Sequence, residues 1–286
     1  DLTSALDFIK KFGKSKLFYG LEYVHNKVNS DGKQTNIVTG NVSETSPRYP
    51  DDATWESLAA YVSLQSKIAK SLSLQIGLRY NHIFLYANFD NPFYVFPFAE
   101  ADIKTGALTG SAGLNWQASD NFSWRLNFST AFRAPNIDDI GKIFDSEPGS
   151  VVVPNPDLKP EYAYNGELGA VLKLGDKTTI DLTGYLTFLE DALVRRDFSI
   201  DGQAEIIYQG ELSNVQAIQN GGKAQVYGLE AGIEVNFTKE FQLTSQYNYT
   251  GGHQVEENGS KVAVRHVAPQ FGNIHFIWKH HKLKLD

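Results

Sequence analysis

Apolar and polar residues alternate along most of the chain with a period of two. In 72–80, leucine, isoleucine and tyrosine fill the even positions, whereas serine, glutamine, glycine and arginine fill the odd positions. Side chains on a β-strand point to opposite faces with this period, and a helix would show a period near 3.6. Each such segment therefore predicts an antiparallel strand, and no segment predicts a helix. The same alternation occurs in 122–133, 162–174, 178–188, 227–237 and 241–250.

The composition of the two faces distinguishes two all-β architectures. A soluble sandwich of antiparallel strands has one solvated face and one buried face. Here the polar faces combine Gly, Glu, Arg, Asn and Gln, as the wall of a wide barrel would. The apolar faces end in aromatic residues such as Tyr80, Trp116, Phe132 and Tyr249. Aromatic girdles at both membrane interfaces are typical of transmembrane barrels, so the pattern favours a membrane β-barrel.

The connections between the predicted strands alternate strictly between short and long. In an up-and-down meander, alternate connections lie at the same end of the barrel. Outer-membrane barrels have short periplasmic turns and long extracellular loops, and a soluble sandwich has no reason to sort its loops by length. The predicted short turns lie near 13–14, 69–71, 118–120, 175–176 and 238–239, and the predicted long loops span about 27–53, 87–104, 134–159, 199–221 and 251–261.

These segments predict about eleven strands and the start of a twelfth, with no internal domain boundary in 1–286. A barrel cannot leave strand edges open in the membrane, so we expect the chain to be a portion of a larger barrel domain. The net charge of -7 argues against a nucleic-acid partner, which would need a basic face. The chain has no cysteine, which excludes thiolate metal sites, cysteine nucleophiles and disulfides.

Four short motifs occur in an order that resembles a known family. Phe132-Arg133-Ala134-Pro135 is followed by Asn155-Pro156-Asp157-Leu158-Lys159-Pro160-Glu161, then by Tyr227-Gly228-Leu229-Glu230 and by Arg265-His266-Val267-Ala268-Pro269. The ordered set resembles the barrels of TonB-dependent outer-membrane receptors, and is most similar to iron- and haem-type receptors of the Bacteroidota. The resemblance covers essentially the whole chain.

The resemblance implies a barrel of about 22 strands that is plugged by a separate N-terminal domain outside this chain. It implies a multi-pass protein of a Gram-negative outer membrane, in contact with lipids and lipopolysaccharide, that imports ferric siderophore or haem-type iron. Energy would come from the TonB complex acting through the plug domain. The alternatives are a receptor for another bulky nutrient, such as an oligosaccharide or a cobalamin, and a surface-binding barrel without transport. No cofactor is implied, and no catalytic motif is present.

The loop between the first two motifs holds one group of candidate ligand-binding residues. Arg133 falls on the predicted inner face at the loop end of its strand, followed by Asn136. A guanidinium there suits a plug carboxylate or an anionic cargo, although shaping of the loop is the favoured role for both motifs. Asp138 and Asp139 suit a hard cation, but the favoured interpretation is a solvated acidic loop. In the family's haem receptors a histidine usually lies in this loop, and 137–153 contains none.

The remaining candidates lie near other loops. Arg195 and Arg196 lie where a strand approaches a long loop, and would attract an anionic ligand or lipopolysaccharide phosphates. Phe93 and Tyr94 belong to an aromatic segment, 89–98, that suits either a flat ligand or packing within the loop. Two histidines are predicted to lie near loop ends where they would reach an external haem, namely His82 and His253.

Overall fold

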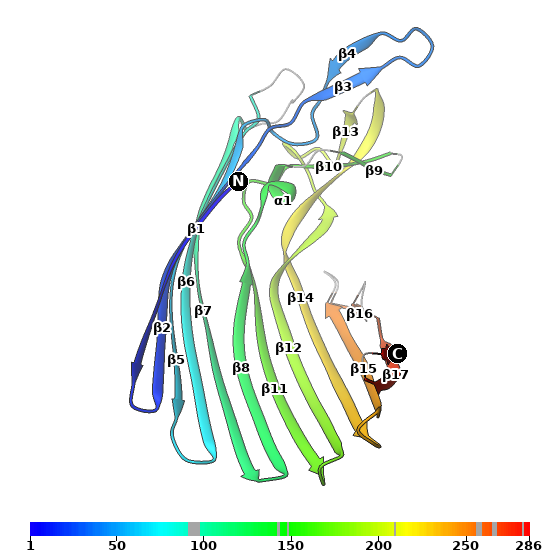
Figure 1. Cartoon of the computed structure of the whole chain (residues 1–286). Helices are drawn as coiled ribbons and strands as arrows, with labels where there is room; N and C mark the ends of the chain where they lie inside the picture. Colours follow the sequence, from blue (N-terminus) through cyan, green and yellow to red (C-terminus); the bar gives the residue numbers. More distant parts are fainter. Residues whose placement is uncertain are drawn as a thin grey trace.

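The computed structural model describes residues 1–90, 98–141, 144–147, 149–208, 210–255, 259–264, 268–281 and 283–286, with only the backbone described in 144–147. Antiparallel pairing joins its long strands into one curved sheet (Figure 1). This confirms the predicted all-β class. The long strands are β1 (Leu2–Phe12), β2 (Ser15–Val28), β5 (Ala53–Lys67), β6 (Leu72–Asn88), β7 (Glu100–Ser119), β8 (Phe122–Arg133), β11 (Glu161–Leu174), β12 (Thr178–Asp197), β14 (Glu211–Asn236), β15 (Phe241–Val255) and β17 (Gln270–His280).

The main path of the sheet runs in sequence order from β1 to β17 and on to the short strand β18 (Leu283–Leu285). Within the described residues, this agrees with the prediction of eleven strands and the start of a twelfth. Short strands branch off the path or form a separate hairpin. They are β3 (Gly32–Thr35), β4 (Val42–Thr45), β9 (Phe144–Glu147), β10 (Ser150–Val153), β13 (Glu205–Tyr208) and β16 (Lys261–Ala263).

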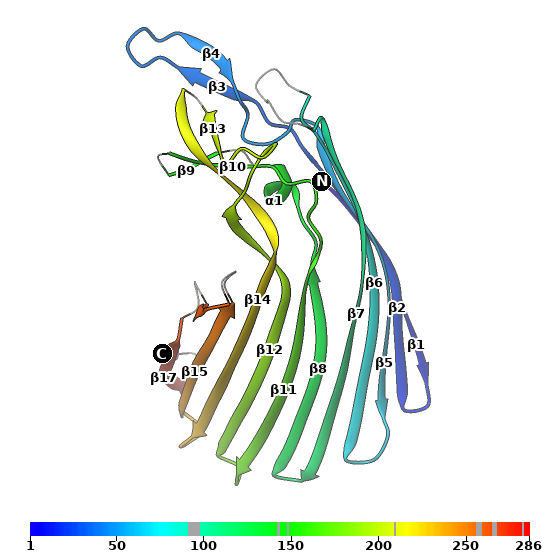
Figure 2. The ribbon, with the colours of Figure 1, turned by 180° about the vertical axis from the view of Figure 1, so that it is seen from behind.

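Short turns and long loops lie at opposite ends of the sheet, as the sequence predicts. The hairpins β1–β2, β5–β6, β7–β8, β11–β12 and β14–β15 close at one end, called here the turn end (Figures 1 and 2). The elements β3, β4, β9, β10 and β13 gather at the other end, called the loop end (Figure 1). β14 extends over 26 residues, and its loop-end half pairs with β10 and β13.

The prediction that the chain contains no helix was wrong. Residues Ile137–Gly141 form the short helix α1 at the loop end, directly after β8. Asn136 caps it by accepting a bond from the backbone N–H of Asp139 at 3.0 Å, and Asp139 accepts one from the backbone N–H of Asn136 at 3.0 Å. This reciprocal cap, together with burial of Ile137 and Ile140, stabilises a helix too short to show a period. Within the described residues, no helix is long and apolar enough to cross a membrane.

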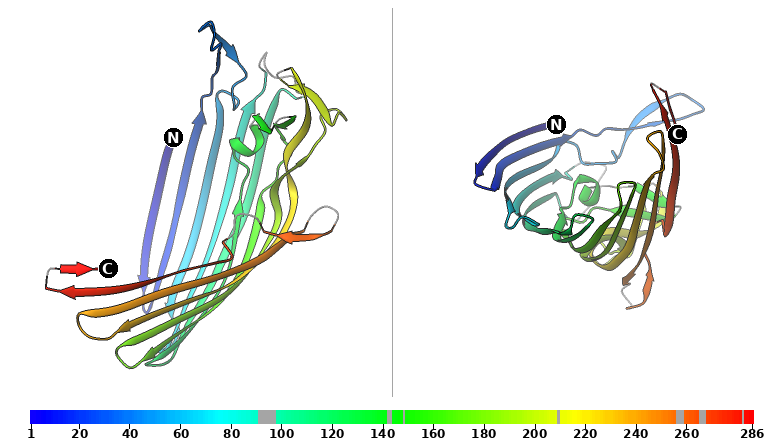
Figure 3. Two further views of the ribbon diagram at one scale, coloured as in Figure 1. Left: turned by 90° about the vertical axis from the view of Figure 1, so that its right-hand side faces the viewer. Right: turned by 60° about the horizontal axis from the view of Figure 1, so that its bottom comes forward.

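The position of α1 identifies the inner face of the sheet. The sheet curves into an open arc, with α1 on its concave side (Figure 3). Leu85 of β6 belongs to the same buried cluster as Ile140, and Ile83, two residues earlier on the same face, is also buried. The neighbouring even positions of β6 therefore face outwards, and Leu78 and Tyr80 are indeed 51% and 48% exposed. The predicted apolar face is thus the convex outer wall, and the predicted polar face is the concave inner wall.

A glycine–tyrosine pairing explains the motif Tyr227-Gly228-Leu229-Glu230. The ring of Tyr227 lies across Gly251 of the next strand, where an added Cβ would be 2.9 Å from the ring. Gly228 lies beneath Tyr185 on the opposite face in the same way. Aromatic side chains that cover glycines on neighbouring strands shield the backbone and fix the register of the sheet. The motif therefore fixes the pairing of three adjacent strands.

Candidate ligand-binding site

Charged and amide side chains on the inner wall bond to one another across strands. Arg79 of β6 donates to Glu22 of β2 through Nη2 at 2.7 Å, and to Asn81 through Nε at 2.7 Å. Asn81 in turn donates to the Ser57 hydroxyl of β5 at 3.2 Å. The inner wall is therefore a polar surface at this level, with its side chains hydrogen-bonded across three strands.

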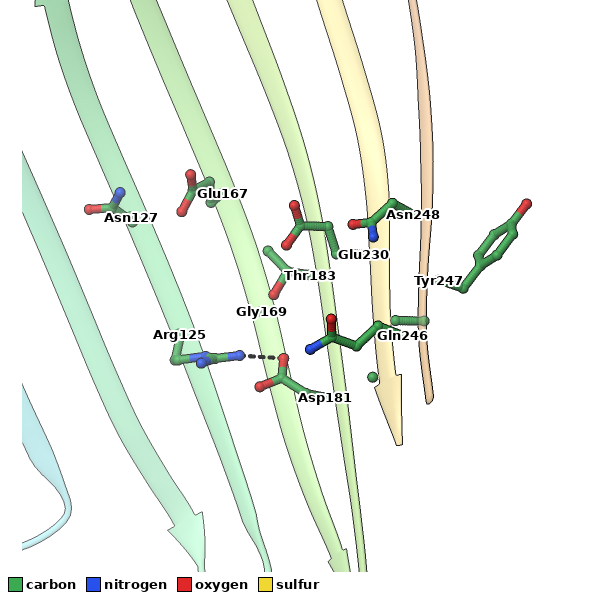
Figure 4. Close-up of a pocket in the computed structure, with 12 residues that line it drawn as sticks. Arg125, Asn127, Glu167, Gly169, Asp181, Thr183, Glu230, Gln246, Tyr247 and Asn248 are labelled. Carbon is green, nitrogen blue, oxygen red and sulfur yellow. Dashed lines mark hydrogen bonds and ion pairs between the residues drawn. The ribbon is translucent and has the colours of Figure 1, made fainter. Parts of the chain in front are cut away.

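Figure 4 shows a polar hollow of this wall, a cavity of about 530 Å³ between β8 and β15. Arg125 of β8 forms an ion pair with Asp181 of β12, and Tyr247 points away from the other side chains to the outer face. Cavities of this volume fall in the range that holds small ligands. The side chains that supply its oxygens and amides include Asn127, Glu167, Thr183, Glu230, Gln246 and Asn248.

This cavity is acidic overall, because Arg125 is the one cation against three carboxylates among its lining residues. It offers many acceptors and amide donors but no paired acid and base aligned on a nucleophile, which suits binding rather than catalysis. Sequence analysis missed it as a site. The signal was available, since its charged and amide residues fall at polar positions of alternating strands, and strand register brings them together.

Arg133 is held by the loop that follows it. Its Nη2 donates to Asp139 Oδ1 and Oδ2 at 2.6 and 2.8 Å, and its Nη1 lies 3.8 Å from Glu161 Oε1. The Asp139 side chain is 9% exposed, whereas that of Arg133 is 44% exposed. Charge-assisted bonds of this geometry fix orientation strongly. The structure thus shows a shaping contact for Arg133, and leaves part of its guanidinium facing the lumen.

Asp138 and Asp139 point to different partners and do not converge. The hydroxyl of Tyr49 donates to Asp138 Oδ1 at 2.8 Å, and this bond, together with partial burial, raises the pKa of Tyr49 above its usual value. In the described residues, no group of three histidine, aspartate or glutamate side chains is arranged to hold a metal ion. Asp138 and Asp139 are therefore held by separate partners, and Asp139 is largely buried rather than solvated.

Apolar packing fixes the loop against the sheet. The buried cluster joins α1 to the loop-end halves of β5, β6 and β7, and Leu158 enters it from the second motif. Trp55 donates from its indole N–H to the backbone oxygen of Pro135 at 3.3 Å. We call the described part of 134–160 the loop cap. It covers the concave side of the sheet at the loop end as a packed element (Figures 1 and 3).

The second motif ties the loop cap to β14. Asn155 donates from Nδ2 to the backbone oxygen of Ile218 at 2.8 Å. Asn220 accepts a bond from the backbone N–H of Lys159 at 2.7 Å, and donates to the Lys159 carbonyl at 2.8 Å. The residues of the second motif therefore hydrogen-bond the loop cap to β14. This matches the favoured prediction that both motifs shape the loop.

Arg195 and Arg196 do not form one basic patch. They are successive residues of β12 beyond an irregularity between Leu189 and Ala192, and they pair with Ile218 and Ala217 of β14. Successive strand residues point to opposite faces, so the two guanidiniums diverge. Arg195 is exposed, and Arg196 is half-buried with Nη1 3.2 Å from the place of a Cβ on Gly221.

His82 and His253 both lie on the outer wall, contrary to the expected approach to an external haem from the loop ends. His82 packs against Phe84 with a centroid distance of 4.6 Å, and its ring lies near that of Tyr80 on the same face. His253 pairs with Gln225, two positions beyond the outward-facing Tyr227. Strand parity puts both on the outer face of the sheet, pointing away from the lumen. The candidates Phe93 and Tyr94 lie outside the described residues.

The fold of the sheet and the polar inner wall together define the class of protein. An antiparallel sheet with an apolar convex face, a polar concave face, sorted loops and a packed cap on the concave side is a segment of a large outer-membrane barrel. The sequence matches the family model described as TonB dependent receptor-like, beta-barrel, over residues 1–279. The chain belongs to this family. It is therefore part of an outer-membrane receptor rather than an enzyme.

Curated relatives share this assignment at modest identity. The chain is 26% identical over 168 residues to an iron-regulated outer membrane virulence protein of Vibrio cholerae, covering 57% of this chain and 25% of the relative. It is 24% identical over 254 residues to the heme/hemopexin utilization protein C of Haemophilus influenzae, covering 82% and 32%. The chain therefore spans a quarter to a third of the length of these relatives.

Solved structures agree on the fold. The copper transporter OprC superposes with a TM-score of 0.77 at 15% identity, over 99% of this chain and 41% of that chain. The hemophore receptor HasR of Serratia marcescens, solved with its hemophore and heme, gives a TM-score of 0.68 at 13% identity, over 97% and 48%. At such identities the likeness establishes the barrel architecture.

Proposed function

We propose that the protein containing this chain imports ferric siderophore or haem-type iron across the outer membrane, energised through TonB. The observation that carries the proposal is membership of the receptor family together with relatives whose names refer to iron regulation and to haem utilisation. The chain supplies a sector of the barrel, with an inner wall and a loop cap between which a cargo passes. TonB, acting through a plug domain that completes the receptor, supplies the energy.

Among iron cargoes, the geometry favours a ferric chelate over a haem bound through the predicted histidines. His82 and His253 point to the lipid side and offer no axial ligand to the lumen. Carboxylate, amide and guanidinium groups line the inner wall instead, including the exposed part of Arg133. These groups recognise polar, charged chelates by hydrogen bonding. Arg195, Arg133 and the aromatic segment with Phe93 and Tyr94 are the first loop-end residues to test.

The test is ligand binding to the full-length receptor in detergent. Haem, haemoglobin, a panel of ferric siderophores and a panel of oligosaccharides are titrated against the same preparation. Saturable binding of a ferric siderophore, weakened by Arg133→Ala, supports the proposal in its favoured form. Haem binding that survives His82→Ala and His253→Ala supports iron import with ligands outside these two residues. Binding of oligosaccharides alone rejects iron and leaves a receptor for another bulky nutrient.

A further inference from the structure

Two lysines of the first hairpin face each other directly on the inner wall. Lys11 of β1 pairs with Lys16 of β2 at the turn end. Strand parity puts both on the face of Asp7 and Glu22, whose partners Tyr61 and Arg79 line the lumen. Like charges directly opposite across an antiparallel pair are destabilising. Both lysines are exposed, and a bound anion would relieve the repulsion between them.

Two further lysines extend this charge. Lys67 of β5 pairs with Ser73 on the inner face, and its backbone N–H bonds to the carbonyl of Lys14 in the adjacent turn at 3.3 Å. Within the described residues, no acidic side chain lies within ion-pair distance of any of the four ammonium groups. We call Lys11, Lys14, Lys16 and Lys67 the lysine cluster.

A cavity of about 450 Å³ lies beside the lysine cluster, with both polar and apolar residues in its lining. Lys14, Lys16 and Lys67 line it together with the amides of Gln75 and Asn115. An ammonium group binds a carboxylate oxygen through a charge-assisted bond, and amide N–H groups satisfy the remaining lone pairs. The volume suits a small multivalent anion or one anionic arm of a larger ligand.

The acidic cavity lies next to the cavity beside the lysine cluster, and the contrast in charge between the two favours binding of an anion at the lysine cluster. Arg125 lines both cavities, but it is paired with Asp181 on the acidic side. The lining of the cavity beside the lysine cluster thus carries cations and no carboxylate, whereas the lining of the acidic cavity carries three carboxylates and one cation. An anion in the lumen is drawn to the first region and repelled from the second, and low-dielectric walls strengthen that field.

We propose that the lysine cluster is an anion site that holds a carboxylate-bearing cargo near its exit into the periplasm. The turn end is the periplasmic end of an outer-membrane barrel, opposite the loop cap. As far as the cargo is concerned, the inference rests on the proposed function, because ferric chelates and haem carry anionic oxygen groups. The inference of an anion site depends only on the charges of the lysine cluster and on the cavity beside it.

The first experiment measures anion binding directly in the full-length receptor. The variant Ser73→Cys carries an environment-sensitive fluorophore at a residue that lines the cavity, in a segment, 1–286, that contains no cysteine of its own. Citrate is titrated as the probe, with sucrose as the uncharged control. We expect a saturable fluorescence change with citrate that weakens as salt is raised, and none with sucrose. The triple variant Lys11→Gln, Lys16→Gln, Lys67→Gln is expected to bind citrate at least tenfold more weakly.

The matched control is Lys10→Gln, because Lys10 adjoins Lys11 in the sequence but faces the outer wall opposite Leu17. It is expected to leave citrate binding unchanged. Equal citrate affinity in wild type and triple variant overturns the site, as does an equal loss in the control. If the triple variant fails to assemble, Lys16→Gln alone serves, with an expected weakening of about threefold.

The second experiment tests the cargo. Cells that express the receptor are supplied with a radiolabelled ferric siderophore or haem, whichever binds the purified receptor. The triple variant is expected to keep surface affinity unchanged while the uptake rate falls severalfold. An unchanged uptake rate overturns the cargo as occupant. If no iron compound binds at all, the proposed function fails, and the citrate titration still decides whether the anion site exists.

Discussion

Removing the Arg133 guanidinium is expected to loosen the loop cap without unfolding the barrel. Arg133→Ala leaves the Asp139 carboxylate, 9% exposed, without its cation, although the backbone N–H of Asn136 still donates to it. Exposed ion pairs contribute about 0.2–1 kcal/mol, and breaking a buried pair costs about 3–5 kcal/mol. Since the arginine is 44% exposed, we expect an intermediate cost of about 1–2 kcal/mol, confined to α1 and its flanks.

Hydrogen–deuterium exchange of the full-length receptor measures this cost locally. A loss of about 1–2 kcal/mol raises the population of the open loop by roughly 5- to 30-fold, and exchange in 136–141 accelerates by the same factor. Peptides from β8 and β11 are expected to keep their exchange rates, because their ladders remain intact. Arg195→Ala is the matched control, since Arg195 is an exposed arginine at the same end of the sheet. Unchanged exchange in 136–141 would refute the reasoning and assign Arg133 to ligand contact alone.

Three further predictions test the packing. Gly251→Ala puts a Cβ 2.9 Å from the Tyr227 ring and is expected to cost about 1–3 kcal/mol, seen as a lower temperature for loss of heat-modifiable gel migration; an unchanged temperature would contradict the covering role. Ile140→Ala empties a fully buried site and is expected to cost about 2–5 kcal/mol in loop-cap protection while gel migration is unaffected; equal protection would count against the packed cap. The pKa of Tyr49 is raised, so its bond to Asp138 stabilises the loop below the usual tyrosine pKa of 10.0 and is lost as pH rises through the raised value. Loss of this bond is expected to increase the opening of the loop, measured by hydrogen exchange, as the pH rises. Tyr49→Phe should abolish this pH-dependent increase, and an increase that persists in the variant would exclude Tyr49 as its source.

The strands and the sorting of the loops were predictable because both depend on local pattern. Period-two alternation records which side chains meet lipid, and it persists over ten or more residues of each strand. The helix α1 escaped prediction because five residues are too few for a helical period. Its cap was nonetheless readable, since Asn136 is followed three residues later by Asp139, the spacing of a capping box.

The site was harder to predict than the fold, for two physical reasons. The loop-end position of His82 does not by itself set the direction of its side chain, because strand parity puts it on the same outward face as Leu78 and Tyr80. A second reason is that a wall site is assembled from single residues on neighbouring strands. Arg125 meets Asp181 only once β11 has aligned β8 with β12, and that register depends on the loop between β8 and β11 and on the turn between β11 and β12. Neither residue is distinctive in its own segment.

TonB-dependent uptake of iron by the full-length receptor tests the central claim most directly. Cells that lack other iron receptors are supplied with radiolabelled ferric siderophores or haem, with TonB present or removed. The account predicts accumulation of at least one iron compound that requires both the receptor and TonB, while surface binding remains when TonB is absent. Binding and uptake of no iron compound, alongside TonB-dependent uptake of another nutrient, would contradict the assignment of iron as the cargo.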